Sequence, residues 1–189
     1  MTVRLRPLLA ADWPAVHSWA RLPESSRYQA WGPNTEEQTR EYCAQTAEVW
    51  QRKPQTRFSY AILDGGPVIG GAGGDRVVGT ADLHLRGEGQ GEIGYGVHPD
   101  VWGRGVATSA ARMLLRIAFE EQGLHRVYGT CDPRNLASAR VLTKIGMTYE
   151  GRMRETMRLH DGWRDSSLFA ILEDEWRASV SAAERPARG

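Results

Sequence analysis

The chain has 189 residues, of which 41% are hydrophobic and 25% are charged, as is typical of one globular domain that buries a core. Its formal net charge of +1 is not the strong positive field of a nucleic-acid-binding protein, so we expect no nucleic-acid partner. Cys43 and Cys131 form no CxxC pair and no histidine cluster has metal spacing, so we expect neither a disulfide framework nor a metal site.

The N-terminal part predicts a strand followed by a helix. Residues 3–8 alternate apolar and basic side chains, which indicates a first strand. Asp12 has the character of an N-cap with Pro14 just inside a helix that ends near Pro23. Residues 1–7 carry no apolar signal region, and no stretch approaches the roughly 18 apolar residues of a membrane span. We therefore expect a cytoplasmic protein that has no membrane partner.

The next part predicts a second helix and an antiparallel pair of strands. Thr35 opens a helix over residues 35–52, and residues 58–63 read as a strand. The glycine-rich segment 64–75 predicts a flexible hairpin connection rather than a nucleotide site, because no Gly-Lys-Ser/Thr follows it. Residues 76–85 are the returning strand. On one of its faces we expect Val78, Thr80, Asp82 and His84.

The second half of the chain alternates strands and helices, a pattern that indicates parallel pairing with crossover helices. The expected elements are a strand at 91–97, a helix at 103–122, a strand at 125–131 and a helix at 135–145. After them come strands at about 148–160 and 165–172, joined by a turn at Asp161-Gly162, and a helix at 173–180. The fold class is thus α+β, a single domain over residues 1–180 built around one central sheet, with a disordered tail at 181–189.

The segment Trp102–Thr108 carries the clearest functional signal. Gly103 and Gly105 allow backbone angles that other residues avoid, and a helix with an apolar stripe is expected from Val106. Unpaired N–H groups and the positive end of the helix dipole favour an anion at that point. A degraded dinucleotide fingerprint is one alternative, but the loop lies late in the chain and His125 stands where an acidic residue belongs. A plain strand-to-helix turn is the other alternative.

Three linked motifs resemble the GNAT superfamily of N-acetyltransferases. The cofactor signature Gln/Arg-x-x-Gly-x-Gly/Ala falls on residues 102–107, with Trp102 at its first position. That departure resembles the RimJ/RimL-like branch, which acetylates ribosomal-protein N-termini and usually carries Trp-Gly-x-Gly-x-Ala-Thr. Residues 92–95 before the loop, and the stretch that opens with Asn135–Ser138, resemble the same branch. The match is strong over 90–150 and plausible over about 3–178.

The resemblance implies the GNAT acyl-CoA acyltransferase fold, a mixed and mostly antiparallel sheet with splayed parallel strands and flanking helices. It implies acetyl-CoA as co-substrate and no metal, with the pyrophosphate on the loop amides and pantetheine beside the splayed strand. The cofactor-binding residues that it implies are Tyr95, Gly96, Val97, Trp102, Gly103, Arg104, Gly105, Val106, Ala107, Thr108, Asn135 and Ser138. Asn135 is also a good helix N-cap, and this purely structural role is the alternative to cofactor binding.

Acetyl transfer needs a base for the amine, a donor for the oxyanion and a proton for the leaving thiolate. Glu92 is the first candidate base because it shares a strand face with Gly94 and Gly96. Weaker candidates are Asp82, His84 and Glu155. Many family members use a Tyr as acid at the position of Leu142, so the branch instead suggests Ser138, with the N–H of Val97 as oxyanion donor.

The acceptor side is less determined by the sequence. Tyr28, Trp31, His84 and Trp163 are the candidate substrate-binding residues. The leading acceptor is a protein N-terminal α-amine, and the alternatives are a small-molecule amine or a non-catalytic sensor that only binds acetyl-CoA. Homodimers are common in the resembling branch, so a homodimer is an expectation by association.

Overall fold

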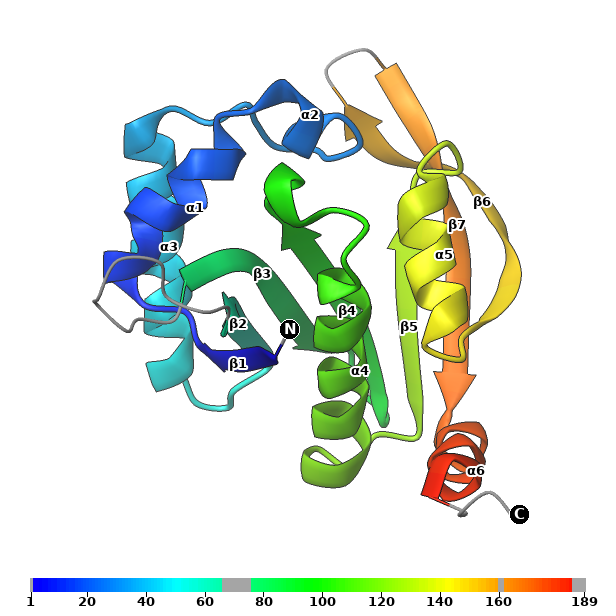
Figure 1. Cartoon of the computed structure of the whole chain (residues 1–189). Coiled ribbons are helices and arrows are strands. Elements are labelled where there is room, and N and C mark those ends of the chain that lie inside the picture. Colours follow the sequence, from blue (N-terminus) through cyan, green and yellow to red (C-terminus); the bar gives the residue numbers. More distant parts are fainter. Residues whose placement is uncertain (1, 66–75, 160–161, 185–189) are drawn as a thin grey trace.

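The computed structural model describes residues 2–65, 76–159 and 162–184, and it contains one seven-stranded sheet in the order β1-β2-β3-β4-β5-β7-β6 (Figure 1). The strands are β1 (Val3–Pro7), β2 (Arg57–Asp64), β3 (Arg76–Leu85), β4 (Gln90–Val97), β5 (Arg126–Cys131), β6 (Thr148–Leu159) and β7 (Gly162–Leu172). The helices are α1 (Trp13–Ala20), α2 (Pro23–Ser26), α3 (Glu36–Glu48), α4 (Val106–Arg116), α5 (Leu136–Lys144) and α6 (Glu173–Glu184). β4 and β5 pair in parallel, and the other neighbouring strands pair antiparallel. This confirms the predicted fold class.

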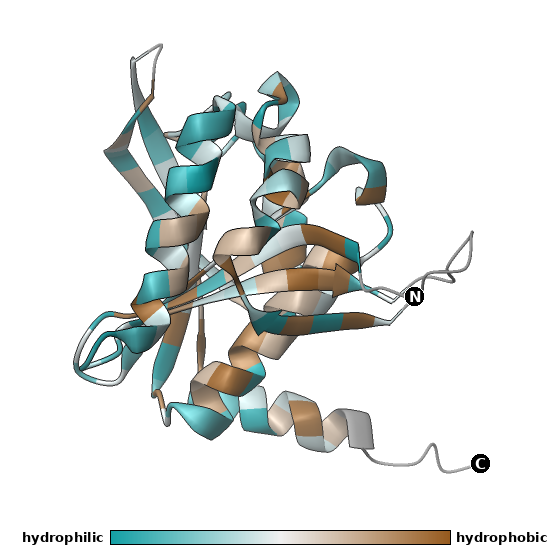
Figure 2. Cartoon of the chain, turned by 90° about the vertical axis from the view of Figure 1, so that its left-hand side faces the viewer, coloured by the Kyte–Doolittle hydropathy of each residue, from teal (hydrophilic) through white to brown (hydrophobic). Residues whose placement is uncertain are grey.

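Helices cover both faces of the sheet, as the alternation along β2 requires. Phe58, Tyr60 and Ile62 point to one face and pack in the core with α4. Ala61 and Leu63 point to the other face and pack with α1 and α3. Hydropathy follows the same division, with hydrophobic residues concentrated where strands and helices face one another (Figure 2).

The covering helices leave one part of the sheet open. In Figure 1, α1 and α3 lie beside β1–β3, whereas β5, β7 and β6 lie at the other side of the molecule. On the face that α1 and α3 share, a cavity opens over β4, β5, β7 and β6. The open sheet face is therefore where a second molecule can approach strand residues directly.

Several predicted helix starts are confirmed, and others need correction. Thr35 caps α3 and forms a reciprocal pair of bonds with Gln38, as predicted. Asp12 does not cap α1 with its side chain; it accepts hydrogen bonds from Arg6 and from the backbone of Leu9. Burial alone would raise the pKa of Asp12, but these hydrogen bonds hold it below its ordinary value. Asp12 thus occupies the predicted N-cap position of α1, but its side chain pairs with Arg6 of β1 instead of bonding to the helix.

The face predicted for β3 was partly wrong. Val78 lies in the core with Ala81 and Leu83, not with Thr80. A bulge explains the difference, because Ile62 pairs with Gly79 while Leu63 already pairs with Val77. The extra residue reverses which face of the sheet each preceding side chain of β3 points to.

The remaining differences concern the ends of elements. α4 begins at Val106 rather than 103, and it continues into a π-helical segment at Ile117–Glu121. β7 already begins at Gly162, and α6 runs beyond residue 180 to Glu184. Most of the glycine-rich segment, Asp161 of the predicted turn and residues 185–189 lie outside the described residues. Within the described ranges, no helix combines the length and apolarity needed to cross a bilayer.

Candidate active site

β4 and β5 separate halfway along their length. Their pairing runs from Gln90↔Arg126 to Glu92↔Tyr128, and no pair follows it on β4. On the other side of β4, His98 donates its N–H to the carbonyl of Val78. Hydrogen-bonding directions alternate along a strand, so the N–H groups of Val97 and Tyr95 are directed toward the gap. The gap thus offers strand-like donors to an extended ligand.

The start of α4 offers a second set of donors. Gly105 is the N-cap residue with φ +80°, and Gly103 has φ +74°. The first helical bond is donated by Ser109, so the amides of residues 106–108 precede the helical ladder. A Cβ built on Gly103 or Gly105 would meet no atom within 4 Å. An anion therefore finds both open space and amide donors at this point.

Trp102 connects these two sets of donors. Its indole Nε1 donates to the carbonyl of Val97 at 3.0 Å, which ties the loop to the end of β4. The side chain is 51% exposed, so one part of it is held while the remainder faces solvent. Val106 is buried in the core, and any contact it makes with an anion would come from its backbone.

A cavity of about 220 Å³ passes between β4 and β5 from one face of the sheet to the other. Glu92 and Gly94 border it from one face, whereas Ile93 and Tyr95 project from the opposite face of the same strand. The helix side of the cavity is completed by Asn135 and Ser138 of α5. Two molecules that enter from opposite faces would meet inside the sheet.

Glu92 lies at the junction of this cavity with the open groove described above. Its Oε2 accepts from Nε of Arg86 at 3.0 Å and also from Nη2, and its side chain is 27% exposed. Tyr128 lies opposite on β5, where burial and the Glu92 carboxylate raise its pKa. A carboxylate has about four acceptor sites, so Glu92 can accept a further hydrogen bond from a donor in the cavity.

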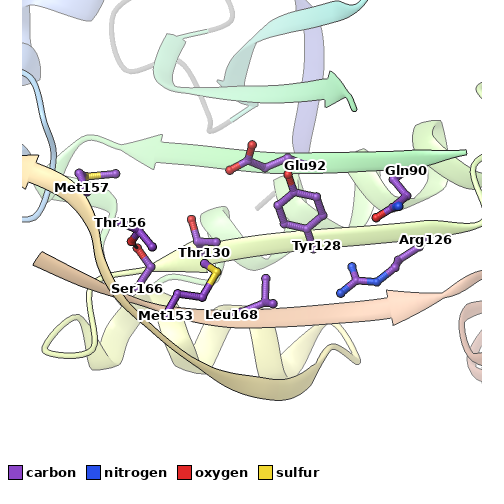
Figure 3. A pocket seen from close by; sticks show the side chains of 10 residues that line it. All are labelled: Gln90, Glu92, Arg126, Tyr128, Thr130, Met153, Thr156, Met157, Ser166 and Leu168. Carbon is purple, nitrogen blue, oxygen red and sulfur yellow. Dashed lines mark hydrogen bonds between the residues drawn. The ribbon is translucent and has the colours of Figure 1, made fainter. Parts of the chain in front are cut away.

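The groove on the open sheet face measures about 500 Å³, and Glu92 lies along it between Met157 and Gln90 (Figure 3). Three apolar side chains of β6 and β7 line it: Met153, Met157 and Leu168. Arg126, whose guanidinium pairs with Glu150, lies toward the end away from Met157. The groove therefore offers one carboxylate, an adaptable apolar wall and polar groups beyond it.

Ser138 and Asn135 lie together at the start of α5. The side chain of Asn135 accepts a hydrogen bond from the N–H of Ser138 at 3.1 Å, so Asn135 caps α5. The same residue also lines the cavity. The hydroxyl of Tyr95 lies 3.2 Å from Ser138 Oγ and 3.2 Å from the Ser138 carbonyl. Tyr95 and Ser138 are 43 positions apart in the chain, and this contact was not predicted from the sequence.

Cys131 also borders this cavity, next to Ser138. Burial raises the pKa of its thiol, and the neighbouring Asp132 carboxylate adds to the effect. A thiol with a raised pKa is a poor nucleophile, because the thiolate is the reactive form. The arrangement favours direct attack of an amine over an acyl-cysteine intermediate.

The candidate substrate-binding residues are not brought together. Tyr28 lines the cavity that passes through the sheet, and the guanidinium of Arg134 lies 5.6 Å from its ring centre. Trp31 and Trp163 are 42% and 55% exposed and border neither the cavity nor the groove. His84 also lies outside both linings, beside Asp82, and burial lowers its pKa.

The weaker candidate bases are engaged elsewhere. Asp82 accepts hydrogen bonds from Arg57 and from Ser59, so it belongs to a half-buried ion pair of the sheet. Glu155 is exposed, has φ +52°, and donates its backbone N–H to Asp165. Neither residue borders the cavity or the groove. Of the carboxylates considered from the sequence, only Glu92 does.

Leu142, at the position where the resemblance expects a Tyr, belongs to the core. It is 1% exposed, and its Cδ2 would lie 2.9 Å from a Cβ built on Gly129. We predict that Leu142→Tyr overpacks this site and lowers the free energy of unfolding by about 1–3 kcal/mol in urea titrations. Leu142→Met, which conserves volume, should cost clearly less. Wild-type stability of Leu142→Tyr would contradict the packing argument.

Comparison with known proteins agrees with this geometry. Residues 2–148 match the family model described as an acetyltransferase (GNAT) domain. An uncharacterized N-acetyltransferase of Bacillus subtilis, YnaD, is 30% identical over 165 residues, which cover 87% of this chain and 90% of that protein. The putative ribosomal N-acetyltransferase YdaF of the same organism is 34% identical over 85 residues, 45% of this chain and 46% of that protein.

Among solved structures, a GNAT-family acetyltransferase from Bacillus anthracis superimposes with a TM-score of 0.76. It shares 30% sequence identity, and the match covers 92% of this chain and 96% of that one. The similarity therefore extends over most of the fold described above.

Proposed function

The chain belongs to the GNAT acetyltransferase family and is an acetyl-CoA-dependent N-acetyltransferase, and from this premise we propose that its acceptor is the α-amine of a protein or peptide N-terminus. The observation that carries the proposal is the pair of cavities that share Glu92. One passes through the sheet, and the other extends as a groove over its open face. A chain end lying in the groove would present its amine at the point where the cavities join.

The residues present fit acetyl-CoA on the α4 and α5 side. The amides that begin α4 and the space above Gly103 and Gly105 suit a pyrophosphate. The N–H groups of Tyr95 and Val97 suit the amides of a pantetheine arm in the gap beside β4. The thioester would then lie near Ser138 and across the gap from Glu92.

The chemistry assigned to this chain is direct transfer. Glu92 accepts a proton from the ammonium, and the free amine attacks the thioester carbonyl carbon. The N–H of Val97 is the proposed donor to the developing oxyanion. As the C–N bond forms and the C–S bond breaks, the nitrogen releases its second proton to solvent, and the electron pair of the broken bond stays on sulfur, which accepts a hydrogen bond from Ser138. The released thiolate then takes a proton from solvent.

The acid–base properties of amines favour an α-amine for a groove in which, among the described residues, Glu92 is the one lining carboxylate. With a pKa near 8, about 10% of an α-amine is already neutral at pH 7, against about 0.04% of a lysine ε-amine. The relative named as a putative ribosomal N-acetyltransferase also supports a protein N-terminus. Buried, unpaired Cys43 and Cys131 fit a reducing, cytoplasmic setting, and the homodimer remains a proposal from the branch resemblance alone.

An acceptor panel tests the proposal. We expect thiol release from acetyl-CoA with short peptides that carry a free α-amine and no lysine, and mass spectrometry should place the acetyl group on that amine. The same peptides with a blocked N-terminus should be inert. Faster turnover of spermidine, of an amino sugar or of a blocked lysine peptide would overturn the α-amine assignment in favour of a small amine or a lysine side chain.

A further inference from the structure

Tyr95 reaches out of β4 to the first turn of α5. Its hydroxyl lies 3.2 Å from both Ser138 Oγ and the Ser138 carbonyl, and both residues line the cavity between β4 and β5. No packing requirement asks for an oxygen at this position, because a phenyl ring would fill the same volume. The hydroxyl is therefore the informative part of the side chain.

We propose that Tyr95 is a positioning residue whose hydroxyl orients the Ser138 hydroxyl toward the departing sulfur of coenzyme A. The inference rests on the role proposed above for Ser138, and it assigns a function to a residue that was expected only to line the cofactor site. It also accounts for a reaction that proceeds with Leu142 at the position where a Tyr was expected.

Electrostatics favours this orientation of the two hydroxyl groups. Either oxygen of the Tyr95–Ser138 pair can donate in the resting site. Once the C–S bond breaks, the negative charge lies on sulfur, so the favoured arrangement has Tyr95 donating to Ser138 Oγ and Oγ donating to sulfur. Both O–H dipoles then point toward the charge, and no group in the pair has to ionise.

Two further observations support a neutral, permanent donor. Burial raises the pKa of Tyr95 above its ordinary value, so its hydroxyl keeps its proton at neutral pH. In the resting site the carbonyl of Ser138 can accept that single proton instead of Oγ, at the same distance of 3.2 Å, so the hydroxyl stays beside the first turn of α5 whichever oxygen accepts. A donor fixed in this way loses little entropy when the charge develops.

The test is a double-mutant cycle with Tyr95→Phe and Ser138→Ala, assayed with whichever amine the wild-type enzyme turns over fastest. We expect Tyr95→Phe to lower kcat about tenfold and to leave the KM for acetyl-CoA within about twofold. In the Ser138→Ala background the same change should have less than about a twofold effect, because the group it orients is gone. Melting temperatures should show that all variants fold.

Tyr149→Phe is the matched control, since that hydroxyl belongs to an exposed side chain outside both cavities, and its kcat should stay at the wild-type value. An unchanged kcat for Tyr95→Phe would overturn the proposal. So would a tenfold loss that persists in the Ser138→Ala background, because Tyr95 would then act without Ser138. The single variant Ser138→Ala reports on the proposed function itself, so the two failures can be told apart.

Discussion

Gly105→Val should weaken the binding of coenzyme A by at least about a hundredfold, which corresponds to about 2.7 kcal/mol. Gly105 precedes the first turn of α4, and its Cβ would project into space that holds no protein atom within 4 Å. That space is where the amides of residues 106–108 can reach a pyrophosphate. Titration calorimetry with coenzyme A measures the effect directly and requires no acceptor.

The same substitution also strains the backbone, so a control must separate strain from lost binding. Gly105 has φ +80°, a region that a β-branched residue strongly avoids. Gly123→Val carries the same kind of strain, with φ +61° and open space around its Cβ, beyond the other end of the same helix. We expect both variants to lose stability and only Gly105→Val to lose affinity. Equal affinity for coenzyme A in Gly105→Val and wild type would contradict the assignment of this loop as the pyrophosphate site.

The sequence predicted the elements better than their exact faces. Local signals were sufficient for Thr35 as a cap and for the glycine loop before Val106. They were insufficient for Val78, because a bulge arises from the pairing of two strands and leaves no mark in the pattern of one. Asp12 occupies the predicted N-cap position of α1, but its side chain does not bond the helix, because its partner Arg6 lies on β1.

The order of the last strands shows a second limit. The chain runs from β5 through α5 to β6, yet β7 occupies the place next to β5 and β6 forms the edge. Periodicity predicts that both strands exist, but it does not say which of them pairs with β5. This insertion brings Ser166 and Leu168 of β7 into the groove beside Thr130 of β5. None of these three residues was among the candidates.

Candidate residues came from contiguous motifs, whereas contacts that are assembled in space were not predicted. Glu92 and Ser138 were candidates because each lies within a short segment that resembles a known motif, and both border the cavity between β4 and β5. Tyr95 was placed near the cofactor, but its contact with Ser138 depends on how far β4 diverges from β5. Glu155 was an attractive carboxylate by position, yet its strand bulges and turns the residue to the surface.

Glu92→Gln should lower kcat/KM by about a hundredfold or more at pH 7 for an α-amine acceptor, the range expected when a general base is removed. Glutamine keeps the size of the side chain and can still accept from Arg86, so the open groove should keep its shape. Melting temperature and affinity for coenzyme A are therefore expected to change little. The lost group is the acceptor for the ammonium proton.

The dependence of this loss on pH distinguishes proton removal from simple binding. An α-amine with a pKa near 8 becomes mostly neutral above pH 9, where it no longer needs a base. The deficit of Glu92→Gln should then shrink toward wild-type activity as the pH rises from 7 to 9.5. Glu155→Gln, which removes an exposed carboxylate outside both cavities, should match wild type at every pH. A constant deficit for Glu92→Gln would mean that Glu92 only binds the acceptor, and a deficit in Glu155→Gln instead would move the base to β6.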